Sequence, residues 1–270
     1  MSNEQPFRAG SRHLWGLLLA CASFVGVAPP PSADASELSV AAASSLREVL
    51  GEIASLHERA HPGLRVRLAF AASSVLATQA RAGAPIDVLV SADERIVDAL
   101  EREGLIDSRS AVAGNRLVVV VARDAALPIE APRDLLAPGV RRIAIPEHAV
   151  PVGRYARQWL ARHGLLEQLD ALTVRTEHAR ATLIAVDQGL VDAAIVYATD
   201  ARLARSARVA FEIPRAEQPR IAYVAAVLAG GTQREAAREF VRFLRGAESA
   251  EILARAGFEP PPSDAGGAAP

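Results

Sequence analysis

The chain reads Ala41-Ala42-Ala43-Ser44-Ser45-Leu46 in one place and Phe70-Ala71-Ala72-Ser73-Ser74 in another, and these two runs are its most informative feature. Each run follows an apolar, strand-like stretch and precedes a helix-like one, so each places serine at the N-terminus of a helix. Serine hydroxyls and free backbone N–H groups meet at such positions and favour negative charge. Neither run contains arginine. Together they predict an anion site built from uncharged donors and helix dipoles.

Strands and helices alternate along the chain on both sides of these runs. Residues 38–43 are typical of a strand, and the helix expected from Ser45 to about Ala60 has apolar residues at the spacing of one buried face. Further elements of the first half are expected as a strand over 66–70, a helix over 75–82 and a strand over 86–90. This order predicts a mostly parallel sheet covered by helices on both faces.

A second unit of the same kind begins near Gly114. Its expected elements are strands over 117–122, 143–145 and 193–197 and helices over 153–164 and 179–189, followed by a returning strand over 221–228. The length of 270 residues also suits two lobes better than one core.

The sequence therefore predicts a two-lobe α/β fold with mixed, mostly parallel sheets flanked by helices and a ligand cleft between the lobes. The expected boundaries are a signal peptide over 1–35, a first lobe made of 36–113 and 222–259, a second lobe over 114–221, and a disordered tail over 260–270.

The N-terminus is typical of an export signal. Arg8 and Arg12 precede an apolar stretch over 14–27, and Ala33-Asp34-Ala35 supplies small residues for cleavage, which predicts a periplasmic protein. The alternative is a lipoprotein signal, Leu18-Leu19-Ala20-Cys21, with the protein anchored through Cys21. Since Cys21 is the only cysteine, cleavage after Ala35 would leave a mature chain without a thiol.

Composition excludes several function classes. The net charge of −1 gives no reason to expect nucleic-acid binding, and all 30 basic residues are arginine, which excludes Schiff-base and P-loop lysine chemistry. The histidines have no metal-ligand spacing and are expected at the surface or in loops. The sequence contains no G-x-S-x-G elbow, so helix capping by the serines is favoured over nucleophilic catalysis, and an enzyme is not expected.

The order of short motifs along the chain resembles that of the molybdate-binding proteins of bacterial ABC transporters, within the type II periplasmic-binding family. The matching runs are Ala42-Ala43-Ser44-Ser45-Leu46, Phe70-Ala71-Ala72-Ser73-Ser74, Ala82-Gly83-Ala84-Pro85-Ile86-Asp87, Val90-Ser91-Ala92-Asp93, Gly114-Asn115-Arg116-Leu117-Val118, Pro146-Glu147-His148, Gly189 with Ala194-Ile195-Val196-Tyr197, and Ala256-Gly257-Phe258. They cover nearly the whole mature chain in family order.

The resemblance implies a tetrahedral oxyanion held by five positions. These are Ser45, Ser73, Val152, Ala179 and Tyr197. No protein group would bind the metal atom directly, and no cofactor is implied. Four of the five, all but Tyr197, lie at expected helix starts, where unpaired N–H groups favour an anion. The same residues therefore fit an anion site on physical grounds.

One segment departs from the family pattern. Ala149, Val150 and Pro151 lie between His148 and Val152, one residue more than expected, and proline has no N–H to donate. The backbone donor is therefore Val152 or Gly153. A carboxylate in the cleft would oppose a proton-free anion, and Glu177 is the candidate, although a solvent-facing role is favoured.

The function predicted from the sequence is capture of molybdate or tungstate and delivery to an ABC importer, a membrane permease with its cytoplasmic ATPase, by a monomeric exported protein. A carrier of sulfate or another tetrahedral oxyanion is the alternative within binding proteins. A ligand-sensing module without transport is the alternative from another class, although no DNA-binding or kinase segment is evident.

Overall fold

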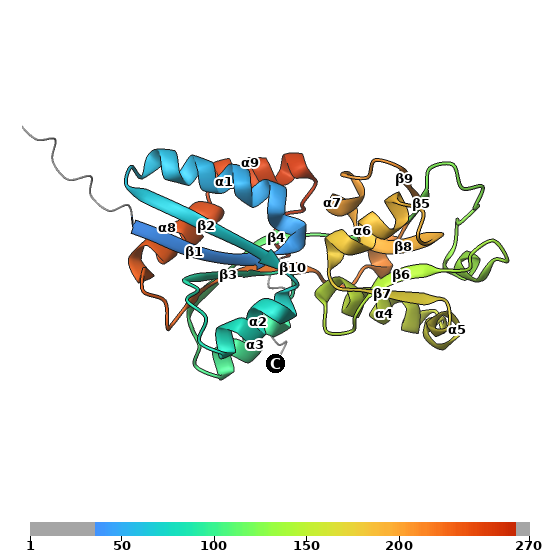
Figure 1. Cartoon of the computed structure of the whole chain (residues 1–270), viewed down its shortest axis with the longest axis horizontal. Coiled ribbons are helices and arrows are strands. Elements are labelled where there is room, and N and C mark those ends of the chain that lie inside the picture. Colours follow the sequence, from blue (N-terminus) through green and yellow to red (C-terminus); the bar gives the residue numbers. More distant parts are fainter. Residues whose placement is uncertain (1–35, 263–270) are drawn as a thin grey trace, which may run out of the picture. The chain divides into compact units, whose positions relative to one another are not determined.

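The computed structural model describes residues 36–262 (Figure 1). The expected signal peptide, including Cys21, and residues 263–270 lie outside this part. Within residues 36–262, no helix combines the length and apolar character needed to cross a bilayer.

The first lobe is built on a five-stranded sheet with the order β2-β1-β3-β10-β4. Its strands are β1 (Ser36–Ala43), β2 (Leu64–Ala71), β3 (Val88–Ser91), β4 (Ile106–Gly114) and β10 (Ala222–Leu228). β1 pairs in parallel with β2 and β3, whereas β10 runs antiparallel to β3 and β4. All residues of β10 are buried, and the returning strand lies between β3 and β4, inside this sheet.

The second lobe repeats the arrangement with the order β7-β6-β8-β5-β9. Its strands are β5 (Leu117–Ala122), β6 (Ile143–Pro146), β7 (Thr173–Thr176), β8 (Ala193–Tyr197) and β9 (Ala207–Glu212). β6 is parallel to β7 and β8, and β5 is antiparallel to β8 and β9. The two-lobe α/β fold with mixed sheets is confirmed. Parallel and antiparallel pairings are nevertheless equal in number in each sheet, because β10 and β5, which follow the crossings between lobes, run opposite to their neighbours.

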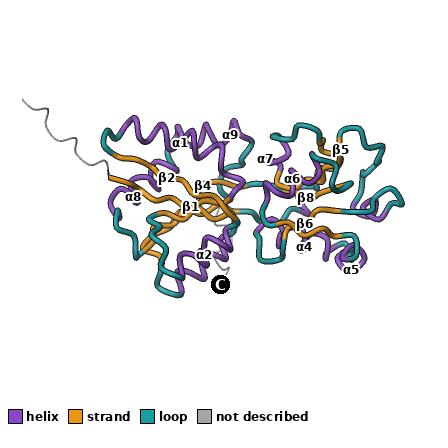
Figure 2. The backbone as a smooth tube through the Cα atoms, viewed as in Figure 1, coloured by secondary structure: helices purple, strands orange, loops and turns teal. Residues whose placement is uncertain are grey.

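Helices flank both sheets (Figure 2). In the first lobe they are α1 (Arg47–Ala60), α2 (Ser73–Arg81), α3 (Glu94–Arg102), α8 (Arg234–Leu244) and α9 (Ala247–Ala256), with a short 3₁₀ helix η1 (Ser44–Leu46). In the second lobe they are α4 (Pro151–Arg162), α5 (Leu166–Asp170), α6 (Ala179–Asp187) and α7 (Ala198–Ala201), with 3₁₀ helices η2 (Pro132–Leu136) and η3 (Arg215–Glu217).

His57 lies in the core, where the sequence predicted a surface or loop histidine. Its side chain is fully buried on α1, and both ring nitrogens lack a hydrogen-bond partner. The ring packs against Phe240 and Phe243, with centroids 5.2 and 5.0 Å away. Burial, followed by the nearby His61, lowers the pKa of His57 and favours the neutral imidazole. The prediction failed because helical spacing does not show how far the apolar face of α1 extends.

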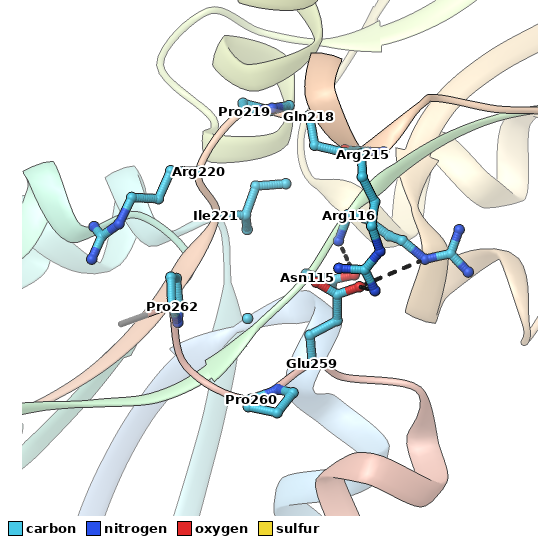
Figure 3. A pocket seen from close by; sticks show the side chains of 11 residues that line it. Asn115, Arg116, Arg215, Gln218, Pro219, Arg220, Ile221, Glu259, Pro260 and Pro262 are labelled. Carbon is cyan, nitrogen blue, oxygen red and sulfur yellow. Dashed lines mark hydrogen bonds and ion pairs between the residues drawn. The ribbon is translucent and has the colours of Figure 1, made fainter. Parts of the chain in front are cut away.

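The segment 259–262 packs against the first crossing between the lobes, near Gly114 (Figure 3). The amide of Gly114 donates to the carbonyl of Glu259 at 2.7 Å, and the amide of Glu259 donates back at 3.0 Å. The Glu259 carboxylate lies 3.1 Å from Arg215 and 4.0 Å from Arg116. A Cβ on Gly114 would lie 2.7 Å from the carbonyl oxygen of Pro260, so residues 260–262, which the sequence placed in a disordered tail, lie close to the crossing.

Candidate functional site

The five predicted site residues line one cavity between the lobes. The two serine runs follow β1 and β2, which are parallel neighbours, so η1 and α2 begin at the same edge of the first sheet. In the second lobe, α4 follows β6, α6 follows β7, and Tyr197 ends β8. The lining residues are Ala43, Ser44, Ser45, Ala71, Ala72, Ser73, Ala92, Val150, Pro151, Val152, Ala179 and Tyr197.

The cavity is small, and all of its lining residues except the half-buried Ala71 are buried. The space open to the centre of a water molecule is about 10 Å³, close to what a single water requires. The exposed fraction of each predicted site residue is 5% or less. A cavity of this size favours a small ligand over one of the size of an amino acid or a sugar.

Ser73 is the first residue of α2 and is oriented by the main chain. Its Oγ accepts a hydrogen bond of 3.0 Å from the amide of Ala92. Because an amide N–H only donates, the Ser73 hydroxyl keeps its own proton for another acceptor. The first amides of α2 have no acceptor within the helix, so they add further donors at this edge.

Ser45 lies in η1, one turn before α1, rather than at the start of a continuous α-helix as predicted. Its Oγ is 2.9 Å from the hydroxyl of Tyr223 on β10, and both groups are buried. The sequence did not indicate this contact, because 178 residues separate the two positions.

The loop of the second lobe that is expected to hold a backbone donor leads into the N-terminus of α4. The helix begins at Pro151, two residues earlier than predicted, and the amide of Val150 closes the preceding loop by donating to Glu147 at 3.0 Å. Val152 lines the cavity, whereas Gly153 is not among the lining residues. A Cβ on Gly153 would lie 2.4 Å from the carbonyl oxygens of Pro146 and Glu147, so the longer loop folds directly against this glycine.

α6 begins at Ala179, as predicted. His178 caps the helix, because its Nδ1 accepts from the amide of Ala181 at 3.1 Å. Ala179 is buried and faces the cavity, so its amide belongs to the first, unpaired turn. Glu177 is exposed and is absent from the cavity lining, which agrees with its solvent-facing interpretation.

Tyr197 presents a buried hydroxyl with no hydrogen-bond partner among the described residues. Burial raises the pKa of Tyr197 well above its usual range, and the phenols of Tyr223 and Tyr155 raise it further, so the hydroxyl stays protonated. Leaving such a group unpaired costs about 1–3 kcal/mol. An acceptor in the cavity would satisfy it.

No carboxylate, histidine or arginine side chain lines the cavity, but two ion pairs join the lobes beside it. Arg154 on α4 contacts Asp93, the N-cap of α3, at 2.7 Å. Arg180, next to Ala179, pairs with Glu48 on α1. In the sequence, Asp93 stood only within a family motif, and Arg154 and Arg180 were missed, since nothing local distinguishes them from the other arginines.

The described residues contain no cluster of three or more histidine, cysteine or acidic side chains that could hold a metal ion. The chemistry available to the cavity is therefore that of O–H and N–H donors converging from two lobes. This arrangement suits a small anion that offers acceptors and carries its charge into a site without counter-charges.

Comparison with known proteins identifies the family of the chain. The family model described as bacterial extracellular solute-binding protein matches residues 38–259. The chain belongs to this family. It is 32% identical over 256 residues to the molybdate-binding protein ModA of Escherichia coli, covering 92% of this chain and 98% of that protein.

Other relatives extend the comparison. The chain is 32% identical over 252 residues to ModA of Mycobacterium bovis, covering 90% of this chain and 93% of that protein. The solved periplasmic molybdate-binding protein of Azotobacter vinelandii superposes with a TM-score of 0.75 at 24% identity, covering 83% of this chain and all of that one. This last likeness supports the fold alone.

Proposed function

We propose that this solute-binding protein captures molybdate, or the closely similar tungstate, and delivers it to an ABC importer formed by a membrane permease and its cytoplasmic ATPase. The observation that carries the proposal is the small cavity between the lobes, which is lined by hydroxyls and helix N-termini and by no charged side chain. The relatives named molybdate-binding protein support the choice of ligand. The anion is cargo, so the function requires no cofactor and no catalytic step.

The proposed ligands to the anion are the hydroxyls of Ser45, Ser73 and Tyr197 and the backbone amides of Val152 and Ala179. Hydrogen bonds to a charged group contribute roughly 1.5–3 kcal/mol each. Helix dipoles add up to ~2 kcal/mol in partly buried sites. Together these contributions are large enough to offset dehydration of the anion and leave the roughly 8 kcal/mol of a micromolar complex.

The choice of molybdate over phosphate follows from proton count. Part of the phosphate population near neutral pH keeps a proton, which needs an acceptor in the site. Molybdate, tungstate and sulfate carry none and need donors only. The cavity lining supplies hydroxyls and amides but no carboxylate, and Glu177 stands outside it. Discrimination between sulfate and molybdate then depends on anion size.

We propose in addition that the protein acts as a monomer outside the cytoplasm, either free in the periplasm after removal of residues 1–35 or anchored through Cys21. Mass spectrometry of the protein recovered from the producing cells distinguishes the two, because a lipid on Cys21 changes both the mass and the N-terminus.

Calorimetry of the purified protein with molybdate, tungstate, sulfate and phosphate tests the ligand. We expect binding of molybdate and tungstate at micromolar concentration or below, corresponding to at least about 8 kcal/mol, with sulfate weaker and phosphate scarcely competing. Tighter binding of sulfate would assign the protein to the alternative oxyanion. Equal affinity for phosphate would contradict the donor-only site.

A further inference from the structure

A buried hydrogen-bond chain leads from the first crossing between the lobes to Ser45. The Asn115 side-chain amide nitrogen donates to Thr199 Oγ1 at 2.9 Å and to the Tyr223 hydroxyl at 3.2 Å. The Tyr223 hydroxyl in turn lies 2.9 Å from Ser45 Oγ. The exposed fraction of all four residues is 5% or less, so water does not compete for these bonds.

The orientation of Asn115 is fixed by its other partner. Its Oδ1 accepts from the amide of Arg116 at 2.8 Å, and an amide N–H cannot accept. The oxygen must therefore face Arg116, and the NH₂ group must face Thr199 and Tyr223. Figure 3 shows Asn115 beside Arg116 on the crossing, with Glu259 nearby.

The direction of the remaining bonds follows from this orientation. The Tyr223 oxygen accepts a hydrogen bond from the Asn115 side chain. The single proton of the Tyr223 hydroxyl is therefore available for a hydrogen bond to Ser45 Oγ. Burial raises the pKa of Tyr223, which keeps that proton in place. This orientation allows Tyr223 to donate to Ser45 Oγ, and in that arrangement the Ser45 O–H is left for the cavity.

We propose that Tyr223 and Asn115 are positioning residues that hold the Ser45 hydroxyl as a hydrogen-bond donor and thereby favour proton-free oxyanions over protonated ones. This inference rests on the proposed function. Ser73 reaches the same state by accepting from the main-chain amide of Ala92. The two serines thus present the same polarity, one set by backbone and the other by side chains that can be replaced.

A double-mutant cycle on Ser45 and Tyr223 tests the inference, with molybdate and inorganic phosphate as the probes. Tyr223→Phe removes the hydroxyl and keeps the ring, so we expect molybdate affinity to fall roughly three- to tenfold, the range of one neutral hydrogen bond. In the Ser45→Ala background the same change should alter affinity by less than about twofold, because Tyr223 acts only through Ser45. The ratio of molybdate affinity to phosphate affinity should fall in Tyr223→Phe. Without Tyr223 as its donor, the Ser45 hydroxyl can also accept a hydrogen bond from the protonated oxygen of phosphate.

Two further variants complete the design. Asn115→Ala removes the amide that orients Tyr223 and should change affinity and anion preference in the same direction as Tyr223→Phe; it also serves if Tyr223→Phe does not fold. Tyr155→Phe is the matched control, because its buried hydroxyl donates across the lobes to the Ala92 carbonyl at 3.4 Å without contacting Ser45. It should leave the preference unchanged.

The outcomes are distinct. If the wild-type protein binds neither molybdate nor another proton-free oxyanion, the proposed function fails and this inference fails with it. The wild type could bind molybdate while Tyr223→Phe weakens molybdate binding equally in the wild-type and Ser45→Ala backgrounds. Tyr223 would then act on the crossing between the lobes and not through Ser45, and the inference alone would be overturned. An unchanged preference for molybdate in both Tyr223→Phe and Asn115→Ala also overturns it.

Discussion

The two lobes bring differently prepared polar groups to the cavity. In the first lobe, Ser73 Oγ accepts from Ala92, and Ser45 Oγ shares a hydrogen bond with Tyr223. In the second lobe, the Tyr197 hydroxyl and both carboxylate oxygens of Asp200 are buried without a hydrogen-bond partner among the described residues. The first-lobe serine hydroxyls at the cavity therefore have protein partners, whereas the Tyr197 hydroxyl of the second lobe has none; Asp200 lies outside the cavity lining.

Under the proposed function, this difference would couple anion binding to the contact between the lobes. An unpaired buried polar group costs about 1–3 kcal/mol, so the closed arrangement is disfavoured mainly through the second lobe. An anion that accepts from Tyr197 removes that cost, whereas the serines lose little when the lobes separate. In the proposed function, the first lobe would offer hydroxyls already held by protein partners, and the second lobe would make closure depend on the ligand.

The largest expected effect concerns Asp200 on α7. Burial raises the pKa of Asp200 from 3.8 to about 7, with Arg180 opposing the rise. A folded-state pKa above the unfolded value means that stability is lost as pH rises from about 4 to about 7 and is constant above that range. Asp200→Asn removes the charge, so at about pH 8 it should be more stable than the wild type by up to roughly 4 kcal/mol. Urea unfolding at several pH values measures the difference, which should shrink toward pH ~4.

A buried aspartate of the first lobe provides the control. Asp87 accepts hydrogen bonds from the amides of Ser39, Thr232 and Gln233 at 2.8–3.0 Å. Asp87→Asn should therefore be destabilising, by about 1–3 kcal/mol, the opposite sign at high pH. Destabilisation of both variants at high pH would show that Asp200 has a partner after all and would remove the contrast between the lobes.

A smaller effect is expected on the stability of the ligand-free protein, which should differ between variants of Tyr197 and of Ser73. Both Tyr197→Phe and Ser73→Ala should weaken molybdate binding by about 1.5–3 kcal/mol, since each removes a donor to a charged ligand. Without ligand they should differ: Tyr197→Phe removes an unpaired hydroxyl and should not lower stability. Ser73→Ala leaves the Ala92 amide without its hydrogen-bond acceptor and should lower the free energy of unfolding by about 1 kcal/mol.

Calorimetry and ligand-free unfolding on the same preparations measure both quantities. Equal losses of ligand-free stability in the two variants would mean that the Tyr197 hydroxyl is paired in the free protein, and closure would then not depend on it.

The sequence predicted the parts of the molecule that local patterns control. Apolar periodicity gave the alternation of strands and helices, and serines placed just after strands gave Ser45 and Ser73 at one sheet edge. The edge and outer strands β4, β7 and β9 were missed because their burial is partial, so neither alternation nor a continuous apolar run marks them.

Sequence patterns could not predict the long-range contacts beside the cavity. Asn115 lies 84 residues from Thr199 and 108 from Tyr223, and only the tertiary fold brings them together. Asn115 stood within a motif that suggested family membership but no role. Arg154 and Asp93 meet across the lobes for the same reason, 61 residues apart.

The smallest expected effect tests whether the second lobe offers donors alone. Glu177 is two residues from Ala179 yet exposed and outside the cavity lining, so its charge reaches the anion only through solvent. Glu177→Gln should raise molybdate affinity slightly, by less than about 1 kcal/mol, as for other exposed charges, and the gain should disappear as ionic strength increases. Phosphate affinity should change by the same factor, because long-range repulsion does not distinguish two anions of similar charge. A selective loss of phosphate binding, measured by calorimetry on the same variant, would instead show Glu177 accepting the phosphate proton at the cavity and would place an acceptor in the second lobe.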